Sequence, residues 1–254
     1  LDVIGNKIAT GGVGIVVGAD ATVDSNVIND ASPNERGFGT EGIVVAQGAI
    51  GVAPGHVRIT GNRVHDRTGT AIALRTPVRT FMVKQNILTR VGAGIAIEGK
   101  GSAERVAVDN NELFDVAARE GADTPFGIIL LRAESMAVAG NTLAGVGAGA
   151  TSIPVRAGIV AVAADDIRVT GNVVDTVGPQ SEGGFLGLAV GIVVSGPFNA
   201  ASVSDNSARF GTDRLAPSEG TWTALMVMSA GASNVMRLGA GKAVVTTALG
   251  ARGL

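Results

Sequence analysis

A short motif that recurs along most of the chain limits the available folds more than any other feature of the sequence. The motif is an aliphatic residue, two further residues, an asparagine, one more residue and an apolar residue, as in ITGNRV at residues 59–64. Self-similarity with a period of a few tens of residues predicts a solenoid, in which each repeat adds one unit to a stack. The motif asparagines are Asn6, Asn26, Asn62, Asn86, Asn111, Asn141, Asn172 and, in a weaker copy, Asn206.

A second motif, Gly-Ile followed by two or three apolar residues, comes after each asparagine motif. Its copies begin at residues 14, 42, 94, 127, 158 and 191, with AIAL at 71 and a degenerate ALMV at 224. Gly and β-branched residues are poor helix formers, whereas short strands with tight turns accommodate both. We therefore expect each repeat to contain two short strands, with Ile95 and Ile97 pointing inward in the copy at 94.

The spacing between consecutive motif asparagines is irregular and ranges from 20 to 36 residues. A stack of short strands tolerates such variation, because only the strands must align while the connecting loops leave sideways. The composition, with 38 glycines, no tyrosine and no cysteine in 254 residues, also suits stacked strands with tight turns. The predicted fold is all-β, a single-stranded parallel β-helix (solenoid) of about 7–9 coils around one aliphatic core.

The spacing Val/Ile-x-Gly-Asn-x-Val followed by Gly-Ile resembles the repeats of the pectin-lyase-like superfamily of right-handed parallel β-helix proteins. That superfamily includes pectate lyases, alginate epimerases, polygalacturonases and phage tailspikes. The resemblance covers roughly residues 1–228 and rests on core and turn positions, so it implies a right-handed parallel β-helix but no particular activity. It also implies that Asn62 and its equivalents form a stacked ladder at a turn, which is a structural role.

A repeat that runs nearly from end to end indicates one domain, residues 1–254. Residues 1–228 hold the regular coils. Residues 229–254 keep apolar alternation but lose the asparagine motif, and we interpret them as an atypical terminal coil or cap. The chain starts inside a repeat and without methionine, so we expect it to be a segment of a longer polypeptide.

Five links between an asparagine motif and the next Gly-Ile motif are longer than the others. Because all five leave the coil at the same corner, we expect them to crowd one side of the solenoid. One more insertion, Ala46–Gly55, leaves at another corner. The long links are Asp30–Glu41, Asp115–Phe126, Gly145–Ala157, Thr176–Ala189 and Ser207–Trp222.

The outward positions of the Gly-Ile strands are apolar in copy after copy. A bare apolar row of this length is unusual on a soluble monomer, so either the long links or another chain should cover it. We favour a cover in which Phe126, Phe185 and Trp222 pack against Ile129, Val193 and Met226; in the alternative, the links form an exposed binding wall. The row is Val16, Val44, Ala73, Ala96, Ile129, Val160, Val193 and Met226.

His65 and Asp66 form the most attractive catalytic pair, because histidine is the ordinary acid–base group near neutral pH. Alginate epimerases of the resembled superfamily use a histidine and acidic residues in a motif like Asp-Pro-His-Asp, which Arg-Val-His-Asp matches only in part. The other interpretation is structural. Asp66, Arg90 and Asp115 each follow a motif asparagine by four residues, so they would form an alternating-charge ladder on successive coils.

Lys84 and Asp109 form a second candidate site, on an outward row that also contains Thr60. A polysaccharide lyase needs a base near the sugar C5 proton, and carboxylates or Ca²⁺ to neutralise the uronate. The two side chains suit part of that chemistry, but they would equally form one exposed ion pair of small energetic value. Arg75 and Glu98, at the ends of neighbouring strands, allow the same two interpretations.

Composition excludes several classes of function. The net charge of −2 provides no field for nucleic acid, and no apolar run approaches the roughly 18–20 residues of a membrane span. The absence of cysteine removes disulfides, thiol catalysis and cysteine-ligated metals. One tryptophan and no tyrosine also argue against a groove that stacks sugar rings for catalysis.

We therefore expect a non-catalytic structural and binding segment of a secreted, cell-surface or virion-like assembly protein. Its partner would be a polysaccharide or a protein along the long-link side. The alternative is a carbohydrate-active enzyme, a lyase or epimerase acting on an acidic polysaccharide, with His65, Asp66, Lys84 and Asp109 as catalytic candidates. The sequence indicates no cofactor and no metal site, and only a lyase would require Ca²⁺.

Overall fold

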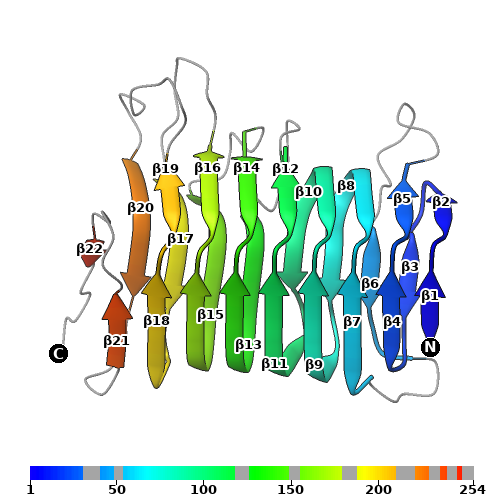
Figure 1. The fold of residues 1–254 in the computed structure, drawn as a ribbon, viewed down its shortest axis with the longest axis horizontal. Helices are drawn as coiled ribbons and strands as arrows, with labels where there is room; N and C mark the ends of the chain where they lie inside the picture. Colours follow the sequence, from blue (N-terminus) through cyan, green and yellow to red (C-terminus); the bar gives the residue numbers. More distant parts are fainter. Residues whose placement is uncertain are drawn as a thin grey trace.

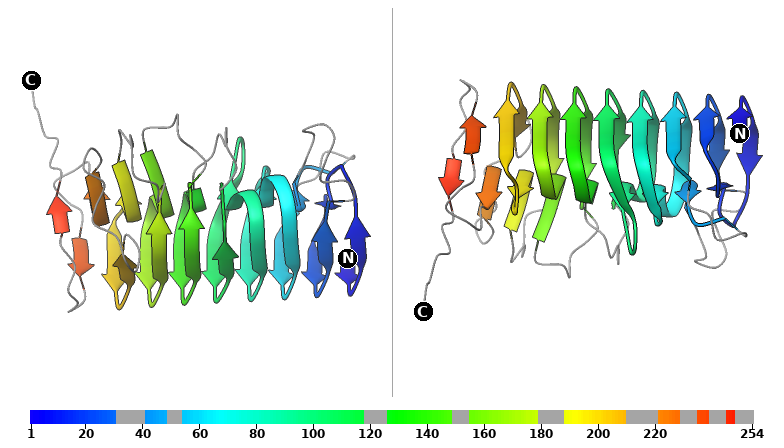
Figure 2. Two further views of the ribbon diagram at one scale, coloured as in Figure 1. Left: turned by 90° about the horizontal axis from the view of Figure 1, so that it is seen from above. Right: turned by 90° about the horizontal axis from the view of Figure 1, so that it is seen from below.

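The computed structural model describes residues 1–30, 41–48, 54–117, 126–148, 155–178, 188–209, 221–228, 235–238 and 245–247. Within these ranges the chain forms 22 β-strands that pair in parallel. The strands stack along one long axis, with the N-terminus at one end and the last strands at the other (Figure 1). In both turned views the strands remain side by side along this axis (Figure 2). None of the described residues forms a helix able to cross a membrane.

Each complete coil contributes a strand to three parallel sheets, which we call A, B and C in the order in which a coil visits them. Four long strands bend from one sheet into the next: β8 (Arg63–Leu74) and β10 (Ile87–Ile97) from B to C, and β13 (Phe126–Ala139) and β15 (Val155–Thr170) from C to A. The other strands of sheet A are β1 (Asp2–Ile4), β4 (Ala21–Asp24), β7 (His56–Thr60), β9 (Pro77–Lys84), β11 (Ser102–Asp109), β18 (Ala200–Ser204) and β21 (Val235–Leu238).

Sheets B and C complete the coil. Sheet B also contains β2 (Lys7–Ala9), β5 (Val27–Asn29), β12 (Glu112–Phe114), β14 (Thr142–Val146), β16 (Val173–Val177) and β19 (Ser207–Arg209). Sheet C also contains β3 (Ile15–Val17), β6 (Ile43–Val45), β17 (Leu188–Ser195), β20 (Thr221–Met228) and β22 (Val245–Thr247). The predicted parallel β-helix is confirmed, but a coil has three strands and not two, because the residues just after each asparagine form a strand of their own.

The turn between sheets A and B explains the asparagine motif. The residue before the asparagine has a positive φ in all eight copies, for example 66° at Gly61 and 55° at Gln85. This left-handed backbone bends the chain from sheet A into sheet B within one residue (Figure 1), and glycine adopts it without steric cost. The turn therefore aims each asparagine side chain into the stack.

The eight asparagines form a continuous hydrogen-bonded ladder. Asn86 shows the pattern: its backbone N–H and its Nδ2 donate to Oδ1 of Asn111 at 3.0 and 2.9 Å, and Nδ2 also donates to the carbonyl of Ile59 at 3.1 Å. The six asparagines from Asn26 to Asn172 have no exposed surface. The predicted buried stack is confirmed, and each amide satisfies backbone groups that would otherwise lie buried without a partner.

The glycine of the Gly-Ile motif lies where sheet C comes closest to sheet B. A Cβ on Gly94 would lie 2.1 Å from the carbonyl oxygen of Gly127 and 2.4 Å from Cδ2 of Leu113. A Cβ on Gly42 would lie 2.5 Å from the carbonyl oxygen of Ala71. At Gly42 and Gly94 the next coil and the sheet B side chains therefore leave little room for a larger residue, whereas the copy at 71 has alanine at this position.

Arg67 is a charged residue inside the aliphatic column, with 1% of its surface exposed. Its Nη1 donates to the carbonyls of Thr10 at 2.6 Å and Asn29 at 3.1 Å, and its Nη2 donates to those of Glu41 at 3.1 Å and Gly12. Burial lowers its pKa. One guanidinium thus joins carbonyls from the two preceding coils, whereas the later coils carry valine at this position, as the register with Val91 shows.

The described strands on either side of each undescribed range agree with the predicted corners. Residues 31–40, 118–125, 149–154, 179–187 and 210–220 each separate a strand of sheet B from the next strand of sheet C. Residues 49–53 separate β6 in sheet C from β7 in sheet A. In the terminal stretch, β21 pairs with β18 and β22 with β20, so residues 235–238 and 245–247 extend sheets A and C by one more coil.

We predict that Asn111→Leu lowers the free energy of unfolding by about 1–3 kcal/mol, because both ladder neighbours and the carbonyl of Val83 lose buried partners. Denaturant melts measure the change. Asn6→Leu is the control, since Asn6 is exposed at the end of the ladder, and its effect should be smaller. A loss at Asn111 within about 0.5 kcal/mol would contradict the structural role of the ladder.

We predict that Arg67→Met lowers the free energy of unfolding by about 1–3 kcal/mol, because the carbonyls of Thr10, Asn29 and Glu41 lose a charged donor. Arg63→Met, which removes an exposed guanidinium from the same strand, is the matched control and should change stability by less than about 0.5 kcal/mol. Equal free energies of unfolding for the two variants would show that the buried contacts of Arg67 make no net contribution to stability.

Candidate functional site

His65, Asp66 and Arg90 meet on the outer surface of sheet B. Nδ1 of His65 lies 2.9 Å from Oδ2 of Asp66, and Arg90 donates from Nε to Oδ1 at 2.6 Å and from Nη2 to Oδ2 at 2.8 Å. This fork from Arg90, followed by the contact from His65, holds the pKa of Asp66 well below its usual range. The predicted pairing of Asp66 with Arg90 across adjacent coils is confirmed.

The backbone at these residues repeats from coil to coil. Asp66, Arg90 and Asp115 have φ values of 58°, 52° and 55°, so the left-handed conformation is part of a regular turn. Strain confined to one coil would have suggested a functional constraint, whereas a repeated conformation has a structural origin. Asp115 occupies the next position of the alternating row. The contact with Asp66 raises the pKa of Arg90, and the charge of Asp115 adds a smaller effect in the same direction.

Lys84 and Asp109 pair on the outer surface of sheet A. Their Cα atoms are register partners on β9 and β11, and Thr60 is the partner of Lys84 on the other side. Nζ of Lys84 lies 2.8 Å from Oδ2 of Asp109. The predicted outward row is confirmed, and the two charges neutralise each other.

The structure does not bring the four sequence candidates together. His65 and Asp66 lie on sheet B, Lys84 and Asp109 lie on sheet A, and the ladder turn separates the two sheets. Acid–base catalysis requires groups that converge on one reacting atom within hydrogen-bond reach. Across the described ranges, no three His, Cys, Asp or Glu side chains gather closely enough to hold a metal ion.

The apolar row on the outside of sheet C is aligned as predicted. Each member is the Cα partner of the next, from Val16 through Val44 to Met226. Val16 is 62% exposed, Ile129 and Met226 are half-buried, and the remaining members are buried. The row is therefore shielded over most of its length.

In the coils with short links, polar side chains lie over this row. Arg75 follows the end of β8, yet its Nη2 reaches Glu41, which precedes the beginning of the neighbouring strand β6, at 2.5 Å. Glu98 contacts Arg75 at 3.0 Å and accepts a 2.6 Å hydrogen bond from Thr70. The small side chain of Ala73 leaves room for these contacts along the strand. The predicted Arg75–Glu98 pair is confirmed, but Glu41 and Thr70 complete the network and were not predicted.

In the later coils, a second apolar cluster lies outside the main core. Its buried members are Ala157, Val160, Val190 and Val193, and Phe126 packs against them as the predicted cover requires. Trp222 contradicts that prediction: it packs against the interior core and not against Met226. The reason is its register with Ala189, whose side chain points inward. Phe185 lies outside the described residues.

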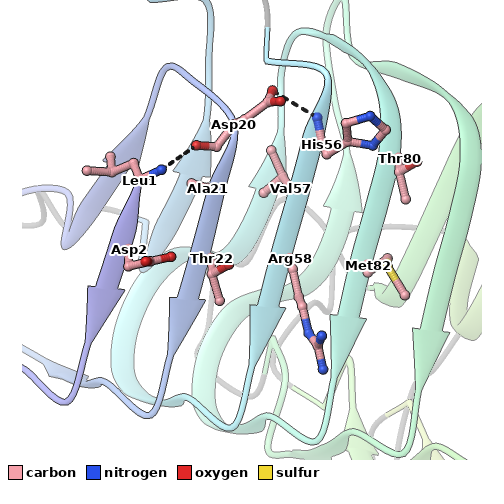
Figure 3. Close-up of a pocket in the computed structure, with 10 residues that line it drawn as sticks. All are labelled: Leu1, Asp2, Asp20, Ala21, Thr22, His56, Val57, Arg58, Thr80 and Met82. Carbon is pink, nitrogen blue, oxygen red and sulfur yellow. Dashed lines mark hydrogen bonds between the residues drawn. The ribbon is translucent and has the colours of Figure 1, made fainter.

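A hollow of about 310 Å³ lies on the outer surface of sheet A, over β1, β4, β7 and β9 (Figure 3). His56 and Arg58 project from β7, while Asp2 and Thr22 lie on the two preceding strands. Asp20 stands at the rim, where its Oδ1 accepts from the backbone N–H groups of Gly55 at 2.5 Å and His56 at 3.0 Å.

These residues were not among the sequence candidates. The hydrogen bonds from the backbone N–H groups of His56 and Gly55 lower the pKa of Asp20, so this carboxylate stays ionised and fixed in position. The alternating pattern of β7 could have revealed two of these residues, because it places His56 and Arg58 outward on either side of the inward Val57. Neither His65 nor Lys84 lines the hollow.

We predict a pH-dependent contribution of Asp66 to stability. Because its pKa is depressed in the folded state, the stabilisation is present above the ordinary aspartate pKa of about 3.9 and is lost as the pH falls towards the folded value. Urea melts should show Asp66→Asn less stable than the unmodified protein at pH 5, with the gap shrinking towards pH 2. The control Asp165→Asn changes an exposed carboxylate on β15 and should show no such convergence. A gap at Asp66 independent of pH would contradict the ion pair.

Comparison with known proteins places the chain in a family but identifies no individual relative. A search of curated proteins and a search of solved structures each found no match. The model of the family described as the right-handed β-helix region matches residues 1–174, more than half of the 254 residues. That match agrees with the parallel sheets and the asparagine ladder, and the protein therefore belongs to the right-handed β-helix family.

Proposed function

We propose that this chain is a rigid, non-catalytic β-helical segment of a secreted, cell-surface or virion-like assembly protein, with a structural and binding role. The long-link side of the solenoid would carry a polysaccharide or protein partner. Nine strands of sheet A at about 4.8 Å per coil give a body on the order of 40 Å long. A stack of this kind holds surface groups at fixed intervals along its length, which suits a scaffold.

One observation carries the proposal: each candidate acid or base is held in an ion pair, and the pairs lie on different sheets. Asp66 is held by the two-point contact of Arg90, and Lys84 is held by Asp109. A lysine in such a pair must leave its carboxylate partner before its amine can come within hydrogen-bond reach of a substrate atom. The two pairs are therefore best interpreted as contacts that join adjacent coils.

A single feature favours the alternative, an enzyme that modifies an acidic polysaccharide. The carboxylate of Asp66 contacts Nδ1 of His65, and this arrangement fixes the tautomer of an imidazole used for acid–base catalysis. His65 retains 34% side-chain exposure, so its ring is accessible to a solute. This feature makes His65 the residue on which a catalytic test must concentrate.

We predict no depolymerisation and no epimerisation when the protein is incubated with polygalacturonate or alginate, with or without Ca²⁺. Ultraviolet absorbance detects the unsaturated ends formed by a lyase, and proton NMR of the polymer detects a change in uronate composition. His65→Gln and Lys84→Met should be indistinguishable from the unmodified protein. Product formation that His65→Gln or Lys84→Met abolishes would overturn the proposal and assign an enzyme.

A further inference from the structure

We propose that the hollow on sheet A, over β1, β4, β7 and β9, binds a neutral, hydroxyl-rich sugar unit of a glycan. This surface is separate from the long-link side discussed above, and the inference does not depend on a partner there. Its volume of about 310 Å³ lies at the lower end of the range of about 300–1,000 Å³ typical of small-molecule sites. That volume suits one or two sugar rings better than a folded partner.

The hollow lies where the short side chains of Asp2 and Thr22 stand beside the longer side chain of Arg58. Asp2, Thr22 and Arg58 are consecutive Cα partners on β1, β4 and β7. Asp2 and Arg58 are therefore two strand spacings apart, about 10 Å, with only the small Thr22 between them. The Arg58 side chain runs along its own strand, where Nε donates to Thr60, so its guanidinium is not directed at Asp2 (Figure 3).

The lack of an ion pair distinguishes Asp2 and Arg58 from other charged residues on the solenoid. Lys84 and Asp109 sit on adjacent coils and pair at 2.8 Å, and Arg209 pairs with Asp175 at 3.2 Å. Within the described part of the chain, neither Asp2 nor Arg58 has an ion-pair partner; Arg58 donates from Nε to Oγ1 of Thr60 at 3.2 Å. The hollow thus keeps an available carboxylate acceptor and available guanidinium donors.

Hydroxyl groups are the ligand chemistry that satisfies both sides. A sugar hydroxyl donates to a carboxylate and accepts from a guanidinium, and both hydrogen bonds are strengthened by the charge. Thr22 and Thr80 add hydroxyls, and Met82 adds an apolar surface for the C–H groups of a ring. A diol spanning the hollow would therefore bind Asp2 at one end and Arg58 at the other.

The charges also favour a neutral ligand over a uronate. The hollow contains two carboxylates, Asp2 and Asp20, and Asp20 is kept ionised by the backbone N–H groups of Gly55 and His56. An added carboxylate would be repelled by both. The positive groups among the lining residues are Arg58 and the N-terminal ammonium of Leu1, and that ammonium already donates to the carbonyl of Asp20 at 2.9 Å. The same carboxylates accept hydrogen bonds from uncharged hydroxyls.

Saturation-transfer NMR with defined oligosaccharides tests the site. The neutral probes are the tetramers to hexamers of cellulose, starch, mannan and xylan, and the acidic probes are oligogalacturonate and oligoalginate of equal length. We expect transfer to at least one neutral probe, and calorimetry with that probe should give an association constant that falls about tenfold or more in Arg58→Met and in Asp2→Asn.

Matched controls separate the hollow from general charge effects. Arg63→Met removes an exposed cation from sheet B, and Asp165→Asn removes an exposed carboxylate from β15; both should bind the neutral probe as the unmodified protein does. Circular dichroism melts confirm that each variant is folded. Mass spectrometry of the recovered probe should find it intact, so cleavage would count against the non-catalytic role and not against this site. No binding of any neutral probe, stronger binding of the acidic probes, or equal binding by all four variants would overturn the inference.

Discussion

The asparagine ladder is the interaction on which the rest of the structure depends, because it fixes how far each coil turns before the next begins. An amide side chain carries a donor and an acceptor on opposite sides, so it can bond to the coil before it and the coil after it at once. Asn111 receives two hydrogen bonds from Asn86 and donates to Asn141. Neither leucine nor aspartate could do both, since one has no polar group and the other only acceptors.

Once the ladder and the inward aliphatic residues set the stack, the outer surfaces are free to differ. Sheet C is shielded over most of its outer row, which lies beside the Arg75 network in the short coils and joins a second apolar cluster in the later ones. Sheet A stays open and polar, and a hollow forms where Asp2 and Thr22 are shorter than Arg58. The same backbone geometry therefore supports one closed and one accessible surface, according to the side chains alone.

Features that repeat at a fixed offset could be predicted from the sequence. The burial of Asn62, the alignment of Val44 with Ala73 and the Lys84–Asp109 pair all follow from copying one coil onto the next. Features that occur once could not. The contacts of Arg67 depend on carbonyls two coils away, and its only signal was a charge where later coils carry valine.

Two expectations about single residues were wrong or incomplete. Trp222 was expected outside because it ends a long link that was expected to fold over the outer row, but it lies on β20 in register with the inward Ala189. The hollow was missed because Asp2, Thr22 and Arg58 lie in three different repeats, and none of them marks a site within its own repeat.

The outer charges of a solenoid provide a general argument about function. Opposite charges on adjacent coils lie within one strand spacing and neutralise each other, as Asp66 and Arg90 do, so their presence reports on stacking. Asp2 and Arg58, by contrast, have no ion-pair partner among the described residues, and they leave hydrogen-bonding capacity available to a ligand. In a repeat protein, the unpaired charges in a hollow therefore carry more information about binding than the histidine–aspartate pair that first attracts attention.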